Sequence, residues 1–345
     1  MALAGNLIGR GSHDYVFRSQ WHADQLPDAI TDGAELHVIP KVSNYLKEFA
    51  RSAVTGGRAY PSERYDLVLN LDALGMASGG RRRMTIIHDI YYATTPDTIG
   101  KVQWMKQQSI HASMVARSSV IVGISEATSA EVRKHFPRAA DRVRTILSDS
   151  TMNDVLPGDL PPRLEPNGYV LAVANVTPNK NFGVLARAFA RMCGDFPDLR
   201  LVHVGGDADE LFAGILAEKG MQDRLIRLRG ISDQQLAAVY ANAAALVVPS
   251  IVEGFCLPIV EAQRLDCPVV FSNRSACGEI GGSGGISFDP LDEDALEMHL
   301  RGVVGDPALR DALRGMGRAN AARFSWDRTT SLYEAAILDT INREK

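Results

Sequence analysis

Short runs rich in β-branched and apolar residues alternate with longer amphipathic stretches along almost the whole chain of 345 residues. The short runs have the length of buried strands, and the longer stretches have helical spacing. Strands that alternate with helices pair in parallel, because each helix carries the chain back to the starting edge of the sheet. The sequence therefore predicts an α/β protein with parallel sheets.

The alternation occurs in both halves of the chain. In the first half we expect strands near residues 15–19, 35–39, 65–70, 84–88, 120–124 and 142–147. In the second half we expect strands near residues 169–174, 201–204, 226–228, 245–249, 269–272 and 285–288. A chain of this length is too long for one comfortable core, so we expect two Rossmann-like, doubly wound domains.

Residues 149–167 lose this periodicity and concentrate proline, which is typical of a connection between domains. We therefore place an N-terminal domain at 1–150, a linker at 151–167 and a C-terminal domain at 168–324. Residues 325–345 are expected to form a last helix that Ser325 can cap and that can return to the N-terminal domain.

Residues 2–9 have helical spacing, and no strand precedes them. A doubly wound domain normally begins with a central strand and a glycine-containing turn. We therefore expect the first strand of the N-terminal domain to be missing, and we favour a truncated chain or a misassigned start over a different architecture.

The composition excludes several classes of protein. With 46% hydrophobic residues, 23% charged residues and a formal net charge of -4, the chain fits a folded protein and not a disordered one. Its apolar runs are too short to span a membrane, and its start lacks the features of a secretory signal, so a cytoplasmic location is expected. No aromatic residues accompany the basic run at residues 81–83, which we interpret as a solvated strand entrance; nucleic acid is not an expected partner.

Four cysteines, Cys193, Cys256, Cys267 and Cys277, lie in the second half. They form no Cys-x-x-Cys pair and have no histidine ligands nearby, which argues against a zinc site or a disulfide framework. We expect buried free thiols, because an unpaired cysteine is usually a small core residue.

The segment 249–262, Pro-Ser-Ile-Val-Glu-Gly-Phe-Cys-Leu-Pro-Ile-Val-Glu-Ala, follows a buried strand pattern and opens a helix. Gly254 and its neighbours can therefore present backbone N–H groups to an anion at a helix N-terminus. Two carboxylates, Glu253 and Glu261, flank this turn, and near a phosphate they would repel the ligand unless they bind hydroxyl groups. We assign them to sugar hydroxyls, although solvated or helix-capping glutamates fit the spacing equally well.

The same segment, with seven residues between its glutamates, resembles the E-x7-E motif of glycosyltransferase family 4, whose usual form is E-G-F-G-L-P-x-x-E. The similarity continues in the family's order through residues 173–181, 204–206, 228–233 and 267–272, so it extends over about the whole second half. The resemblance implies the GT-B architecture and a retaining, metal-independent transfer of a sugar from a nucleotide diphosphate.

The resemblance also implies roles for individual residues. Glu261 should hold the donor ribose, Glu253 should contact the transferred sugar, and the backbone N–H groups of the turn should bind the sugar and diphosphate. Lys180 should neutralise the diphosphate as it leaves. Family members often have an arginine immediately before or a few residues ahead of this lysine, but Asn179 precedes it here. The donor-binding set expected around the turn comprises Glu261, Gly254, Phe255, Cys256, Leu257 and Asn179.

Further candidates lie at the ends of other expected strands. Gly230 and Ile231 can meet the nucleobase, or they can form a plain capped loop before Ser232. His88 resembles the His-Asp segment of mannosyl- and related transferases and is expected to contact the transferred sugar or the acceptor; a structural histidine is the alternative. Ser125 fits a helix cap as well as a ligand contact.

The resemblance implies a GDP-sugar donor, with a UDP-sugar as the other choice, and a saccharide or lipid-linked saccharide acceptor. No tightly bound cofactor or metal is expected, and we interpret residues 207–209, Asp-Ala-Asp, as the start of a helix. Peripheral contact with the inner membrane face is compatible with these substrates, and nothing in the sequence sets the oligomeric state. A sugar-nucleotide-binding or partner-binding protein without catalysis is the main alternative, and a glycogen-phosphorylase-like or epimerase-like enzyme is a weaker one.

Overall fold

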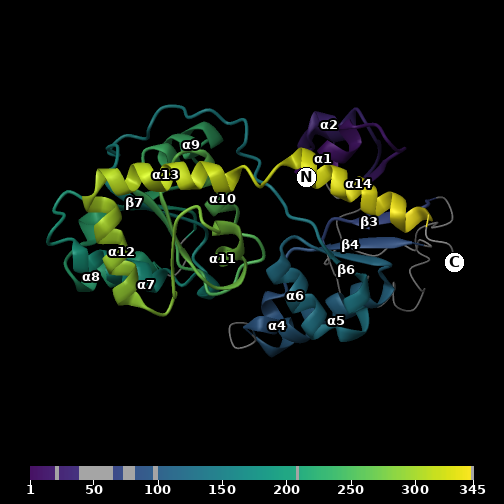
Figure 1. The fold of residues 1–345 in the computed structure, drawn as a ribbon, viewed down its shortest axis with the longest axis horizontal. Coiled ribbons are helices and arrows are strands. Elements are labelled where there is room, and N and C mark those ends of the chain that lie inside the picture. Colours follow the sequence, from purple (N-terminus) through teal and green to yellow (C-terminus); the bar gives the residue numbers. More distant parts are fainter. Residues whose placement is uncertain (20–22, 39–64, 73–81, 96–99, 207–209, 343–345) are drawn as a thin grey trace.

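The computed structural model describes residues 1–345 except 20–22, 39–64, 73–81, 96–99, 207–209 and 343–345. The described residues form two lobes, each built on parallel strands with helices packed against them (Figure 1). This arrangement confirms the predicted α/β class with parallel sheets. The expected start of a helix at residues 207–209 lies outside the described residues.

The first lobe contains two parallel sheets. Its strands are β1 Val16–Ser19, β2 Glu35–Val38, β3 Val68–Asn70, β4 Arg83–Ile87, β5 Val120–Gly123 and β6 Val143–Thr145. Its helices are α1 Ala2–Gly9, α2 Asp28–Thr31, α4 Tyr91–Thr94, α5 Lys101–Arg117 and α6 Glu126–His135. Strands β3 to β6 pair in chain order, and β1 pairs with β2 separately. The predicted strands are present, although several are shorter than the sequence pattern suggested.

The second lobe has a single sheet of six parallel strands in the order β12-β11-β10-β7-β8-β9. Its strands are β7 Tyr169–Val173, β8 Arg200–Val204, β9 Leu225–Leu228, β10 Ala245–Val248, β11 Val269–Ser272 and β12 Ile286–Phe288. Its helices are α7 Phe182–Met192, α8 Leu211–Glu218, α9 Asp233–Ala241, α10 Leu257–Arg264, α11 Ser275–Gly281, α12 Glu293–Gly305 and α13 Pro307–Ala321. The strand order reverses between β7 and β10, and open α/β sheets bind ligands at such a point.

The last helix, α14 Trp326–Asn342, leaves the second lobe and lies along the first (Figure 1). Its buried side chains include Tyr333 and Ile337, which join a hydrophobic cluster with Leu7 of α1. Arg10 adds an ion pair to Glu334 at 2.8 Å. Apolar packing and this ion pair therefore attach the C-terminal helix to the helix that begins the chain.

The basic run before β4 differs from its interpretation as a solvated strand entrance. Arg83 is the first residue of β4 and is only 5% exposed. Burial lowers the pKa of its guanidinium, and the nearby Arg117 lowers it further. The interpretation was wrong for this residue because the run of charges hides that the strand already begins at Arg83.

The four cysteines are free and buried, as predicted. Ser232 caps α9 in a reciprocal capping box with Gln235, and Ser125 caps α6 through its hydrogen bond from the Thr128 N–H. Among the described residues, no helix is long and apolar enough to cross a membrane.

Candidate active site between the two lobes

Two loops of the second lobe carry the predicted donor-binding residues. One follows β7 and contains Asn179 and Lys180; the other follows β10 and runs through Glu253 into α10. Because β7 and β10 are neighbours at the point where strand order reverses, their loops leave the sheet side by side. The Ile251 N–H donates to the Asn179 carbonyl at 2.8 Å, and the Asn179 side-chain amide donates to the Val252 carbonyl at 3.2 Å. These bonds join the two loops into one surface.

Lys180 and Glu253 form the charged centre of this surface. The Lys180 ammonium lies 2.6 Å from Oε1 of Glu253, and the Ser250 hydroxyl donates to the same oxygen at 2.7 Å. Burial opposes the charge of Lys180, but the Glu253 carboxylate outweighs burial and raises the pKa of the lysine. The ammonium is therefore charged and held against Glu253.

The start of α10 supplies backbone donors beside this pair. Among the hydrogen bonds of the described residues, no protein acceptor is found for the N–H groups of Phe255, Cys256 and Leu257. Free N–H groups at a helix N-terminus attract anions, and the helix dipole adds to that attraction. Cys256 caps the helix with φ of 82°, a left-handed conformation that costs a non-glycine residue roughly 1–2 kcal/mol.

Glu261 lies one turn into α10, away from Lys180. Its Oε1 accepts from the Ser150 hydroxyl at 3.1 Å and its Oε2 from the Tyr240 hydroxyl at 2.9 Å. Burial raises the pKa of this carboxyl, and the two hydroxyl donors lower it in part. Beside it, Arg264 pairs with the buried Asp149 at 2.6 Å. The carboxylate is thus fixed by partners that the sequence alone did not indicate.

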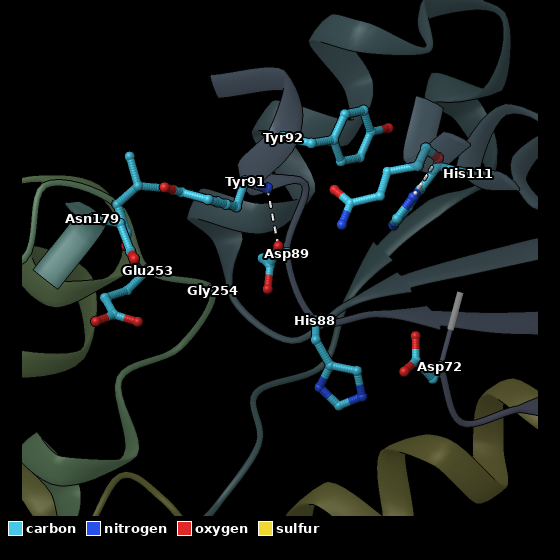
Figure 2. Close-up of a pocket in the computed structure, with 11 residues that line it drawn as sticks. Asp72, His88, Asp89, Tyr91, Tyr92, His111, Asn179, Glu253 and Gly254 are labelled. Carbon is cyan, nitrogen blue, oxygen red and sulfur yellow. Dashed lines mark hydrogen bonds between the residues drawn. The ribbon is translucent and has the colours of Figure 1, made fainter. Parts of the chain in front are cut away.

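A cavity of about 380 Å³ separates the two lobes at this point, within the usual range for small-molecule sites. Figure 2 shows His88 and Asp89 from the first lobe on one side and Asn179 and Glu253 from the second on the other. The cavity is also lined by residues that had no signal of their own in the sequence, namely Asp72, Tyr91, Tyr92, Gln107, His111 and Val252. Lys180 and Glu261 are not among its lining residues.

His88 and His111 differ in their environments. Nε2 of His88 lies 2.9 Å from the Leu71 carbonyl, which only accepts, so Nε2 carries a proton and Nδ1 is free to accept from a ligand in the neutral tautomer. His88 itself is exposed. His111 is buried, which lowers its pKa and favours the neutral ring. No sequence signal distinguished His111, because its position depends on how α5 packs.

Gly254 is a point of direct contact between the lobes. Its carbonyl accepts from the Ser125 hydroxyl at 2.6 Å and from the Thr128 hydroxyl at 2.9 Å. A Cβ at this position would lie 1.8 Å from the His88 carbonyl oxygen, so only glycine fits. The sequence motif places the Gly254 backbone near the expected donor, and the contact with His88 is a second reason for glycine here.

The remaining candidates lie elsewhere. Gly230 is exposed, with φ of 64°, and Ile231 is half-buried between β9 and the cap of α9. Neither lines the cavity. Their contact with a nucleobase stays a prediction.

The family profile described as "Glycosyl transferases group 1" matches residues 161–320. The chain is 31% identical over 264 residues to the O-antigen chain mannosyltransferase B of Escherichia coli, covering 72% of this chain and 68% of the relative. It is 33% identical over 181 residues to the MMP alpha-(1->4)-mannosyltransferase of Mycolicibacterium hassiacum, covering 49% of this chain and 43% of the relative.

Solved structures share the fold at lower identity. A sucrose-phosphate synthase from Thermosynechococcus elongatus superposes with a TM-score of 0.76 at 19% identity, covering 97% of this chain and 92% of the other. WaaG, a glycosyltransferase involved in lipopolysaccharide biosynthesis, superposes with a TM-score of 0.74 at 18% identity, covering 100% and 95%. The expected GT-B fold is therefore confirmed, and the chain belongs to the group 1 glycosyltransferases, a family of hexosyltransferases.

Proposed function

We propose that this enzyme transfers a mannose-type hexose, with retention of configuration, from a nucleotide diphosphate sugar to a saccharide or lipid-linked saccharide. The observation that carries the proposal is the Lys180–Glu253 pair beside the free N–H groups at the start of α10, with Glu253 lining the same cavity as His88. The similarity to two mannosyltransferases supports mannose as the sugar. We favour a GDP-sugar donor over a UDP-sugar.

The residues suggest how the transfer proceeds. The donor diphosphate binds to the Lys180 ammonium and to the N–H groups of Phe255, Cys256 and Leu257. These groups then stabilise the negative charge that grows on the diphosphate as its bond to the sugar breaks. Glu253, released from Lys180, accepts hydrogen bonds from the sugar hydroxyls. A phosphate oxygen of the donor helps to remove the acceptor proton on the same face, so no protein carboxylate has to act as nucleophile.

The assignments of Glu261 to the ribose and of His88 to the sugar or acceptor belong to the same proposal. Glu261 already accepts from Ser150 and Tyr240, so ribose hydroxyls would exchange with these donors or add to them. His88 offers its free Nδ1 to a hydroxyl. Residues 1–150 would then form the acceptor side and residues 168–324 the donor side.

The first experiment measures thermal stability with GDP-, UDP- and TDP-sugars, because a ligand that binds only the folded chain raises its stability. Transfer is then assayed with the sugar nucleotide that binds. We expect GDP-mannose to give the largest shift and to be consumed with a saccharide acceptor. Binding without any transfer or hydrolysis would favour the sugar-nucleotide-binding alternative, and unchanged transfer by Glu253→Ala would remove the proposed role of the loop.

A further inference from the structure

Two of the buried cysteines come together under the proposed donor loop. Cys256 caps α10 and Cys277 lies in α11, 21 positions later in the chain, yet their sulfur atoms and a carboxylate oxygen of Glu253 all lie within 4.8 Å of one another. Neither thiol is more than 6% exposed. The sequence analysis argued against a metal site because these residues have no ligand spacing along the chain.

We propose that Glu253, Cys256 and Cys277 form a binding site for a soft or borderline divalent cation such as Zn²⁺. Two thiolates and one carboxylate supply three of the four ligands that zinc usually takes, with the fourth position open. Thiolate ligands select against Mg²⁺ and Ca²⁺, which prefer oxygen. Both thiols give up a proton to solvent when the ion binds, and no redox change occurs, so binding weakens as the pH falls.

The surroundings agree with this assignment. Lys180 and Ser250 both contact Oε1 of Glu253, and among the described residues no hydrogen bond to Oε2 is found, so one carboxylate oxygen remains for the ion. Glu253 also lines the cavity between the lobes, so we expect the ion to enter from that side. The usual family motif has glycine at the position of Cys256, so this thiolate ligand is not part of that motif.

An ion bound at this site should inhibit sugar transfer. This part rests on the proposed function, because it requires Glu253 and Lys180 to act on the donor. An ion held by Glu253 takes up the carboxylate that would accept sugar hydroxyls, and it places a second positive charge beside Lys180. Occupancy of the site and binding of the donor sugar should therefore compete.

Cobalt titration of the whole, phosphine-reduced chain tests the site without any assay of activity. We expect one Co²⁺ per chain, with the near-ultraviolet absorption of cobalt–thiolate bonds. This absorption should be lost in Cys256→Gly, which is compatible with the left-handed backbone, and in Cys277→Ala. The matched control Cys193→Ser, another buried free cysteine, should retain it. Absence of the band in the wild-type chain, or its persistence in Cys277→Ala, overturns the site.

Circular dichroism and thermal unfolding confirm that each variant is folded. Zinc should then inhibit transfer by the wild-type chain and by Cys193→Ser, but not by Cys277→Ala. If zinc binds without slowing transfer, the inhibitory role is wrong and the site stands. If the chain transfers no sugar even with zinc removed, the proposed function fails while the cobalt result remains valid.

Discussion

The two sides of the cavity are built differently. On the second lobe, Lys180, Glu253 and Asn179 are tied together by hydrogen bonds and an ion pair before any ligand arrives. On the first lobe, His88 and Asp89 are exposed, and their side chains are hydrogen-bonded to the backbone of Leu71 and Tyr91. A charged diphosphate benefits from a wall that is already organised, because no reorganisation is then needed during the reaction. The difference supports the proposal that the rigid wall takes the donor and the looser wall takes the acceptor.

The largest effect should come from the organised wall. Lys180→Met removes the only cation placed beside Glu253 among the described residues, and we expect transfer to fall by about 10²–10³-fold, as for other single donors that stabilise a leaving charge. The unfolding temperature should also fall, because the partly buried Glu253 carboxylate loses its ion-pair partner, so transfer is compared on folded protein. Lys219→Met, at the exposed end of α8, is the matched control. Transfer within a few-fold of wild type in Lys180→Met would remove the argument for a preorganised donor wall.

The second prediction concerns the contact that joins the walls. Gly254→Ala places a Cβ against the His88 carbonyl and should separate the lobes or distort the loop. Overpacking of this kind costs about 1–3 kcal/mol, and we expect both a lower unfolding temperature and a loss of transfer. Gly214→Ala in α8, where a Cβ meets nothing within 4 Å, should be neutral or stabilising by up to about 1 kcal/mol. Equal behaviour of the two variants would show that the lobes do not depend on this contact.

The third prediction tests the looser wall. His88→Ala removes one hydrogen-bonding group from the cavity, and we expect kcat/KM for transfer to fall about tenfold, the equivalent of one hydrogen bond. Donor binding without acceptor should be less affected than in Lys180→Met. His135→Ala, near the end of α6, serves as control. A loss of donor affinity as large as that of Lys180→Met would contradict the division into donor and acceptor walls.

More of the second lobe than of the first could be predicted from the sequence. The strands follow from periodicity, and the resemblance to the family's motifs assigned Lys180 and Glu253 to one expected donor site. The partners Ser150 and Tyr240 of Glu261 could not be foreseen, because they come from a loop and a helix that meet only in the folded chain. The same reason hid the approach of Cys277 to Cys256.

In the first lobe, the position and burial of several polar residues could not be predicted from the sequence. In the sequence, His111 has the pattern of an ordinary residue of an amphipathic helix. Only the packing of α5 brings it to the cavity. Arg83 was interpreted as solvated, yet it begins a buried strand. Local pattern predicts which residues are helical or extended, but the burial of a polar group is decided by elements distant in the sequence. Acceptor-side residues are therefore the hardest to identify from one sequence.

The smallest expected effect concerns Glu261, the second glutamate of the motif. Burial raises the pKa of its carboxyl above the ordinary value of 4.5. The carboxyl therefore favours the folded state while it is protonated, and this contribution is lost as the pH rises through the folded-state pKa. Glutamine cannot ionise, so Glu261→Gln should gain stability relative to wild type as the pH rises from below 4.5 through the folded-state pKa of Glu261.

Urea unfolding at a series of pH values measures this difference, with the exposed Glu218→Gln as control. The control should show a difference in free energy of unfolding between wild type and Glu218→Gln that does not change with pH. If the difference between wild type and Glu261→Gln is also independent of pH, Ser150 and Tyr240 solvate the Glu261 carboxylate adequately. If this difference in free energy of unfolding grows with pH as predicted, the chain keeps a charge at Glu261 that destabilises its own fold. Such a charge is expected where a ligand hydroxyl is to be bound, and it would extend the organised wall from Lys180 to the far end of the donor.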